Sequence, residues 1–135
     1  MIVVDTNIIS YLVVAGERTA EALKALEKDP IWAAPYLWRS EFCNVLTVYA
    51  RKQLVSREDA QNNLEHARHL LHGREYSVSP THVLELAITS TCTAYDCEFV
   101  ALAQDLGVKL VTLDKQILAQ FPETAMALDI FVGSY

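Results

Sequence analysis

The sequence has little of what marks several large protein classes. It contains three cysteines, Cys43, Cys92 and Cys97, with no C-x-x-C pair, which disfavours a disulfide framework and a thiolate zinc site. No apolar run approaches the about 20 residues that a membrane-spanning helix needs. Met1 leads into an apolar run without a basic segment, unlike a secretory signal. We therefore expect a cytoplasmic protein with reduced thiols and no membrane partner.

Basic charge is also scarce. The chain has 11 lysines and arginines against 17 aspartates and glutamates, a formal net charge of −6. This balance weakens a nucleic-acid-binding hypothesis, because phosphate backbones attract cationic surfaces. Setting four acids aside as metal ligands changes the net charge from −6 to −2. Bound divalent cations would then attract phosphate locally, so acidity does not exclude action on nucleic acid.

The chain does contain a repeated alternation of short apolar runs and amphipathic segments. Its 135 residues are 52% hydrophobic and 21% charged, typical of one globular domain, expected here over residues 1–135. The alternation predicts an α/β fold, a central parallel sheet with helices on both faces. The expected strands are 2–4, 31–34, 76–78, 108–112 and 130–132, and the expected helices are 8–14, 19–28, 36–52, 56–71, 80–88, 96–106 and 115–120.

Four acidic residues stand where such a sheet forms its ligand crevice. Asp5 and Asp114 follow expected strands, while Glu41 and Asp96 lie early in expected helices, on their inward faces. Right-handed crossovers bring the carboxyl ends of strands and the amino ends of the following helices to one edge. Taken alone, Asp5 is explained equally well as a helix cap. Four acids at one edge are not explained by capping alone.

The helix and strand near the carboxyl end of the chain illustrate this convergence. The helix 96–106 is about 15 Å long, and the strand returning to Asp114 covers about 16 Å, so Asp96 and Asp114 are expected at the same edge. Helical spacing places Asp96 on the inward face and predicts that Glu98 and Asp105 point the opposite way.

Clustered carboxylates repel one another. A pair about 4 Å apart costs about 4 kcal/mol at an effective dielectric constant near 20, so such groups are either protonated or held together by a cation. Mg²⁺ and Mn²⁺ prefer carboxylate and water oxygens. Either ion lowers the pKa of bound water and neutralises charge developing on a phosphodiester. The pattern therefore predicts metal-dependent phosphodiester hydrolysis.

The motifs that carry these acids resemble those of PIN domains, and most closely the VapC-type toxins of bacterial and archaeal toxin–antitoxin pairs. They are DTN at residues 5–7, SEFCNVL at 40–46, YDCEFVALA at 95–103, and LVTLD at 110–114. Each motif is short, but together they span nearly the whole chain.

The resemblance implies a Mg²⁺- or Mn²⁺-dependent endoribonuclease, usually dimeric and neutralised by a small antitoxin whose tail enters the active-site groove. By the same resemblance, Asp5 and Asp96 match the principal metal ligands. Glu41 matches the helix glutamate, and Asp114 a more variable fourth acid. Polar positions that orient ligands or water are matched by Asn7 and Thr112.

Three alternatives to a PIN nuclease share some of these sequence features. A haloacid-dehalogenase-like phosphatase also begins with a strand ending in Asp, but it needs a second Asp where this chain has Asn7. A receiver-like domain needs paired amino-terminal acids, and only Asp5 is present. A catalytically silent PIN domain that binds protein or RNA is disfavoured by the four intact acids and stays open as the alternative function.

Candidate substrate contacts are few. Arg39 and Lys115 neighbour the proposed acids in the sequence, and Arg51, Lys52 and Arg57 form a second basic cluster. Contact with RNA phosphates and plain solvation are both open for each of them.

Overall fold

A five-stranded parallel sheet forms the centre of the computed structural model, which describes residues 1–134. The strand order is β3-β2-β1-β4-β5, and each neighbouring pair is parallel. The chain thus adds strands on one side of β1 and later returns to add strands on the other. The strands are β1 (Ile2–Val4), β2 (Trp32–Pro35), β3 (Glu75–Tyr76), β4 (Leu110–Thr112) and β5 (Ala125–Ala127).

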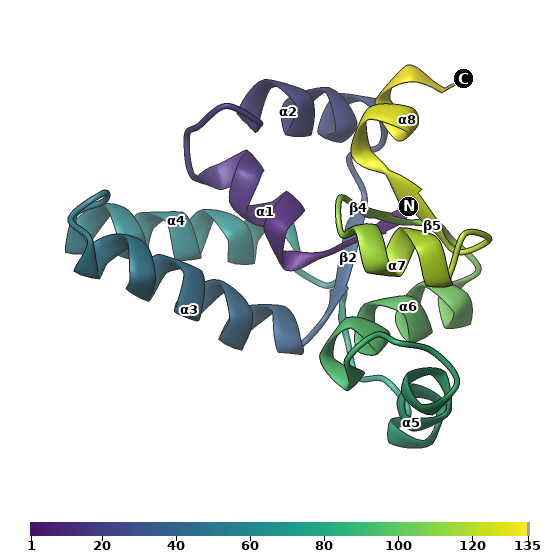
Figure 1. Ribbon diagram of the computed structural model, residues 1–135. Helices are drawn as coiled ribbons and strands as arrows, with labels where there is room; N and C mark the ends of the chain where they lie inside the picture. Colours follow the sequence, from purple (N-terminus) through teal and green to yellow (C-terminus); the bar gives the residue numbers. More distant parts are fainter. Residues whose placement is uncertain (135) are drawn as a thin grey trace.

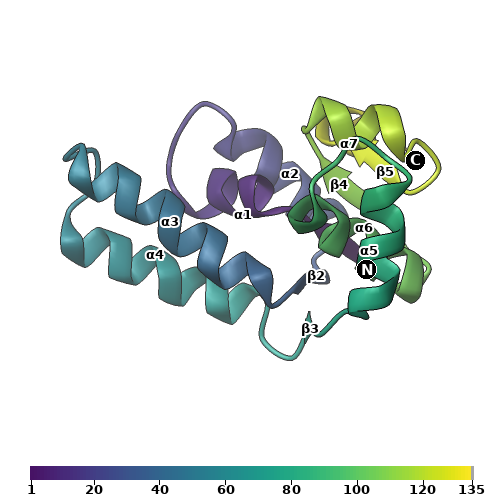
Figure 2. The ribbon, with the colours of Figure 1, turned by 60° about the horizontal axis from the view of Figure 1, so that its bottom comes forward.

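Helices cover both faces of this sheet, as the alternation of elements predicted. Figure 1 shows α1 and α2 on one side of the sheet and α5 and α6 on the other. Both views show α3 and α4 as a paired arm that extends beyond the sheet (Figures 1 and 2). The helices are α1 (Thr6–Val13), α2 (Thr19–Lys28), α3 (Leu37–Arg51), α4 (Arg57–Leu70), α5 (Pro80–Ile88), α6 (Ala94–Leu106), α7 (Lys115–Gln120) and α8 (Leu128–Gly133).

The central strand and α6 are held by the apolar core. All three residues of β1 are buried, as expected of a strand covered on both faces. The core also buries the large side chains of Trp32, Trp38 and Phe42. Helix α6 begins after Thr93, whose side chain accepts a hydrogen bond from the Asp96 amide, and ends at Gly107 with φ +67°. Both predicted ends of this helix are confirmed, and they fix Asp96 relative to the sheet.

One expected element is wrong. Residues 130–132 were predicted as an edge strand, but they lie in α8, and the edge strand is β5 at Ala125–Ala127. The apolar run forms a helix because its buried side chains, Leu128 and Phe131, are three residues apart, while Ile130 is 59% exposed. The third strand is also shorter than predicted, at Glu75–Tyr76.

The structure also describes the helices and the cysteines with respect to membrane spanning and disulfide bonding. Within residues 1–134, no helix combines the length and the apolarity needed to cross a bilayer. The three cysteines are free thiols, with Cys92 and Cys97 buried and Cys43 exposed.

Candidate active site

The carboxyl ends of β1 and β4 place two acids side by side in the fold. These strands are direct neighbours, and the chain moves to opposite sides of the sheet from them, which is where open α/β sheets form a crevice. Asp5 follows β1 and caps α1, its Oδ1 accepting a hydrogen bond of 3.1 Å from the Ile8 amide. Asp114 follows β4 and caps α7 in the same way, accepting 2.9 Å from the Ile117 amide.

Two helices bring further acids to this edge. Asp96 lies in the first turn of α6, and Glu41 lies near the start of α3. All four acidic side chains line one cavity of about 250 Å³. Its other lining residues are Thr6, Asn7, Asn44, Val45, Phe99 and Ile117.

Two threonines orient the acids. The Thr112 hydroxyl donates to Oδ2 of Asp5 and accepts a hydrogen bond of 3.0 Å from the Asp114 amide, so it joins the ends of both strands. The Thr6 hydroxyl donates to Oε1 of Glu41 at 2.7 Å. Thr112 is fully buried, and Asp5 is 8% exposed. These bonds hold the carboxylates in place before any ligand arrives.

The cavity disfavours negative charge. Burial raises the pKa of Asp5 from 3.8 to about 6, and the charges of Asp114 and Glu41 add to the rise. Burial likewise raises the pKa of Glu41, with the charges of Asp96 and Glu98 adding to it. The pKa of Asp96 is raised by burial and by Asp114. A cation in the cavity would stabilise the ionised form of each group.

The donor set fits a hard divalent cation that keeps much of its own water. No three acidic, histidine or cysteine side chains among residues 1–134 lie close enough to hold a metal between them. The four acids therefore line one cavity without forming a compact set of three ligands. Mg²⁺ is commonly held by one or two carboxylates and several waters, so loosely spaced acids around an open cavity suit it. Oxygen donors also suit Mn²⁺.

Comparison with known proteins assigns the family. A sequence model of the PIN domain matches residues 2–123. The chain belongs to the PIN domain family. It is 33% identical over 124 residues to Ribonuclease VapC3 of Pyrobaculum aerophilum, which covers 90% of this chain and 95% of that protein.

The fold of this PIN domain is found in solved structures. The crystal structure of PAE2754 from Pyrobaculum aerophilum has a TM-score of 0.78 and 23% identity, covering 97% of this chain and 92% of the other. A toxin–antitoxin complex from Klebsiella pneumoniae has a TM-score of 0.70 and 23% identity, covering 95% and 98%. VapBC2 from Rickettsia felis, bound to a promoter DNA fragment, has a TM-score of 0.68 and 18% identity, covering 94% and 98%.

The basic residues proposed from the sequence lie outside the acidic cavity of the PIN domain. Arg39 makes two hydrogen bonds to Glu75, from Nε at 2.6 Å and from Nη2 at 2.7 Å, and its guanidinium lies 5.6 Å from the Tyr36 ring centre. Lys115 is exposed at the first position of α7. Neither lines the cavity, whereas the predicted supporting residue Asn7 does, and Thr112 bonds Asp5 beneath it.

Sequence reasoning missed two residues of this region. Asn44 lines the cavity one helical turn after Glu41, a spacing that could have identified it. Thr6 was not identified because its partner Glu41 is 35 residues away. Glu98, which was expected to face away from the site, does not line the cavity, although its charge contributes to the raised pKa of Glu41.

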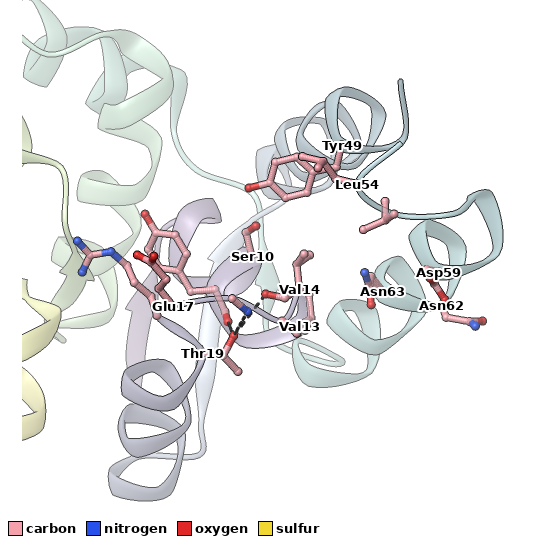
Figure 3. Close-up of a pocket in the computed structure, with 15 residues that line it drawn as sticks. Ser10, Val13, Val14, Glu17, Thr19, Tyr49, Leu54, Asp59, Asn62 and Asn63 are labelled. Atoms are coloured by element: carbon pink, nitrogen blue, oxygen red, sulfur yellow. Dashed lines mark hydrogen bonds between the residues drawn. The ribbon is translucent and has the colours of Figure 1, made fainter. Parts of the chain in front are cut away.

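A second, larger groove of the PIN domain is separate from the acids. It has a volume of about 750 Å³ and lies between α1, the α1–α2 connection and the outer ends of α3 and α4 (Figure 3). Its walls combine Val13, Val14 and Leu54 with the polar side chains of Asn62 and Asn63. None of the four acids lines it, so this groove is distinct from the acidic cavity.

Proposed function

We propose that this PIN domain is a Mg²⁺- or Mn²⁺-dependent endoribonuclease and the toxin of a toxin–antitoxin pair, acting in the cytoplasm. The observation that carries the proposal is the convergence of Asp5, Glu41, Asp96 and Asp114 on one cavity at the carboxyl ends of β1 and β4. The likeness to Ribonuclease VapC3 supports the same activity.

The residues proposed to hold the metal are these four acids. When bound there, the ion supplies an acidified water and neutralises charge on the phosphodiester. The chain's own residues set the geometry. Thr112 and the Ile8 amide hold the two oxygens of Asp5, and Thr6 holds Oε1 of Glu41. Asp114 accepts from the Ile117 amide through Oδ1, which leaves its Oδ2 available for a ligand.

The activity is tested with a circular RNA and Mn²⁺. An endonuclease opens a molecule that has no ends, so loss of the circle distinguishes it from an exonuclease. We expect cleavage by the wild type, and none after chelation or in Asp5→Asn and Asp96→Asn. Asp105→Asn is the matched control, because Asp105 is on α6 like Asp96 but is exposed and pairs with His82. Equal cleavage by all four proteins would refute the assignment. Absence of cleavage in all would favour a silent binding module.

The antitoxin is proposed from the neighbouring complexes, since similar folds occur in a toxin–antitoxin complex and in VapBC2. Induced expression of the wild type is expected to stop bacterial growth, whereas Asp96→Asn is not. A small protein encoded beside the gene is proposed as the antitoxin; its co-expression is expected to restore growth, and the protein is expected to co-purify with the chain. Growth arrest by Asp96→Asn would show that toxicity does not come from the acidic cavity.

A homodimer is proposed on a separate feature, the outer face of α5. Leu84 and Ile88 are four residues apart on this helix and are 58% and 70% exposed. A second copy covering this pair would remove both apolar side chains from water. Light scattering is expected to give twice the chain mass of 15.1 kDa for the wild type and the single mass for Ile88→Glu. A monomeric wild type would contradict this part of the proposal.

A further inference from the structure

Asp96 and Asp114, two acids that line the cavity, lie at the starts of α6 and α7, and α7 is hydrogen-bonded to the connection that leads into α6. Asp114 is the cap of α7, and Asp96 is in the first turn of α6. The connection from α5 to α6 ends at Thr93, whose Oγ1 accepts a hydrogen bond of 3.1 Å from the Asp96 amide. The position of this connection therefore influences the position of Asp96 in the lining of the cavity. Figure 2 shows the connection passing beside α7 before it returns into α6.

Two glutamines of α7 hold this connection at Thr91. Gln116 Nε2 donates to the Thr91 carbonyl oxygen at 2.7 Å and to its Oγ1 at 2.8 Å. The Thr91 amide donates to Gln120 Oε1 at 3.3 Å. Both backbone polar groups of Thr91 are thus bonded by side chains four residues apart on one helix face. We call this contact the glutamine clamp.

The clamp joins the elements that carry the two acids, and it does not line the cavity. Neither glutamine lines the cavity, and both are exposed. Thr91 is two residues before the cap residue Thr93, too few for the chain to absorb a displacement before it reaches Asp96. The helix that carries the glutamines begins directly after Asp114. Loss of the clamp is therefore expected to change the separation between Asp96 and Asp114.

We propose that Gln116 and Gln120 are positioning residues that set the spacing of Asp96 and Asp114 for a divalent cation. This inference rests on the proposed metal-dependent function. The acids are not packed tightly enough to form a ready-made site, so their spacing has to be held by the surrounding structure. Residues that orient metal ligands commonly change metal affinity by about 10-fold to 100-fold when replaced.

The variants are Gln116→Met and Gln120→Met, which keep side-chain length and remove the hydrogen bonds. The matched control is Gln104→Met. Gln104 also makes two side-chain contacts, to Thr124 Oγ1 at 3.3 Å and to His82 Nε2 at 2.9 Å, and lies on the same helix as Asp96 without touching the clamp. All variants are compared by circular dichroism and thermal unfolding, so that a general loss of stability is recognised.

The decisive measurement is binding of Mn²⁺ to the RNA-free protein, followed by electron paramagnetic resonance. We expect the dissociation constant to rise roughly tenfold in Gln116→Met, less in Gln120→Met, and not in Gln104→Met. We also expect RNA cleavage by Gln116→Met to recover at high Mn²⁺, because the acids themselves are intact.

The outcomes distinguish failure of the glutamine clamp from failure of the metal-dependent function. Unchanged Mn²⁺ affinity in Gln116→Met, with clear binding by the wild type, would overturn the clamp alone. An equal loss in Gln104→Met would also overturn it, since the effect would then be general destabilisation. Absence of Mn²⁺ binding by the wild type would overturn the metal-dependent function, and this inference with it.

Discussion

Replacing Asp5 with asparagine is expected to stabilise the metal-free protein at neutral pH while it abolishes cleavage. The carboxyl group of Asp5 is buried, and its pKa is raised from 3.8 to about 6. At 1.36 kcal/mol for each pKa unit, the folded protein disfavours the Asp5 carboxylate by about 3 kcal/mol above pH 6. Asparagine removes that charge and keeps an oxygen that can accept from the Ile8 amide.

The pH dependence follows from the direction of the pKa shift. Between about pH 4 and pH 6 the folded state holds the Asp5 proton more tightly than the unfolded state, so stability falls as pH rises through this window. The favourable contribution is complete below pH 3.8 and lost above about pH 6. Asp5→Asn does not titrate, so its free energy of unfolding should lack this decline.

The expected magnitude includes one opposing effect. An amide at position 5 cannot accept from the Thr112 hydroxyl and from Ile8 together as the carboxylate does, which costs about 1 kcal/mol. The net gain in the metal-free variant at pH 8 is then about 2 kcal/mol, or about 6 °C in melting temperature. At pH 4 the sign should reverse, with the wild type more stable by about 0.4 kcal/mol, because the unfolded-state carboxyl is already partly ionised.

The assay is urea unfolding in a chelator at pH 4, 6 and 8, repeated with Mn²⁺. Added Mn²⁺ should stabilise the wild type more than Asp5→Asn, because a ligand that binds only the folded state adds to its stability. A difference between the two proteins that stays constant from pH 4 to pH 8 would refute the reasoning, because the burial of Asp5 would then carry no electrostatic cost.

Three further predictions concern single side chains. Thr6→Val removes the hydrogen bond that lowers the pKa of Glu41, so cleavage at limiting Mn²⁺ should shift to higher pH, while Thr6→Ser should behave as wild type; identical pH–rate profiles for Val and Ser would contradict this. Arg39→Ala should weaken RNA binding more at low salt than at high salt. The slope of log affinity against log salt concentration should fall by about 0.7, as expected when one phosphate contact of the Glu75-bonded guanidinium is lost; a salt-independent change measured by fluorescence anisotropy would count against it. Gly107→Ala should cost about 1 kcal/mol in urea unfolding because φ is +67°, with Mn²⁺ affinity unchanged; an equally stable variant would show that the left-handed turn is not required.

The placement of the strand-end acids could be predicted because it depends on local patterns. The buried run before Asp5, the cap at Thr93 and the glycine at position 107 are each set by neighbouring residues in the chain. Parallel topology then brings Asp5 and Asp114 to adjacent strand ends without knowledge of any side-chain contact. Local periodicity and one rule of handedness were therefore sufficient for this part of the site.

Two interactions that escaped prediction join segments distant in sequence. Arg39 meets Glu75, 36 residues away, and helical spacing alone could not reveal that partner. The charge of Glu98 contributes to the raised pKa of Glu41 on another helix, which the periodicity of α6 alone could not reveal. Ile130 was assigned to a strand from a run of only three apolar residues, which is too short to distinguish the periodicity of a helix from that of a strand.

The start of α3 is anchored differently from the strand ends that carry the other acids. Asp5 and Asp114 follow neighbouring strands, whereas Glu41 lies on a helix whose outer part extends with α4 beyond the sheet (Figure 2). Trp38 and Phe42, which flank Glu41 on α3, are buried, and the Thr6 hydroxyl donates to its Oε1. Glu41 is therefore held at the packed base of the arm, so the oxygen donor that α3 contributes is fixed by the core and not by the arm's outer end.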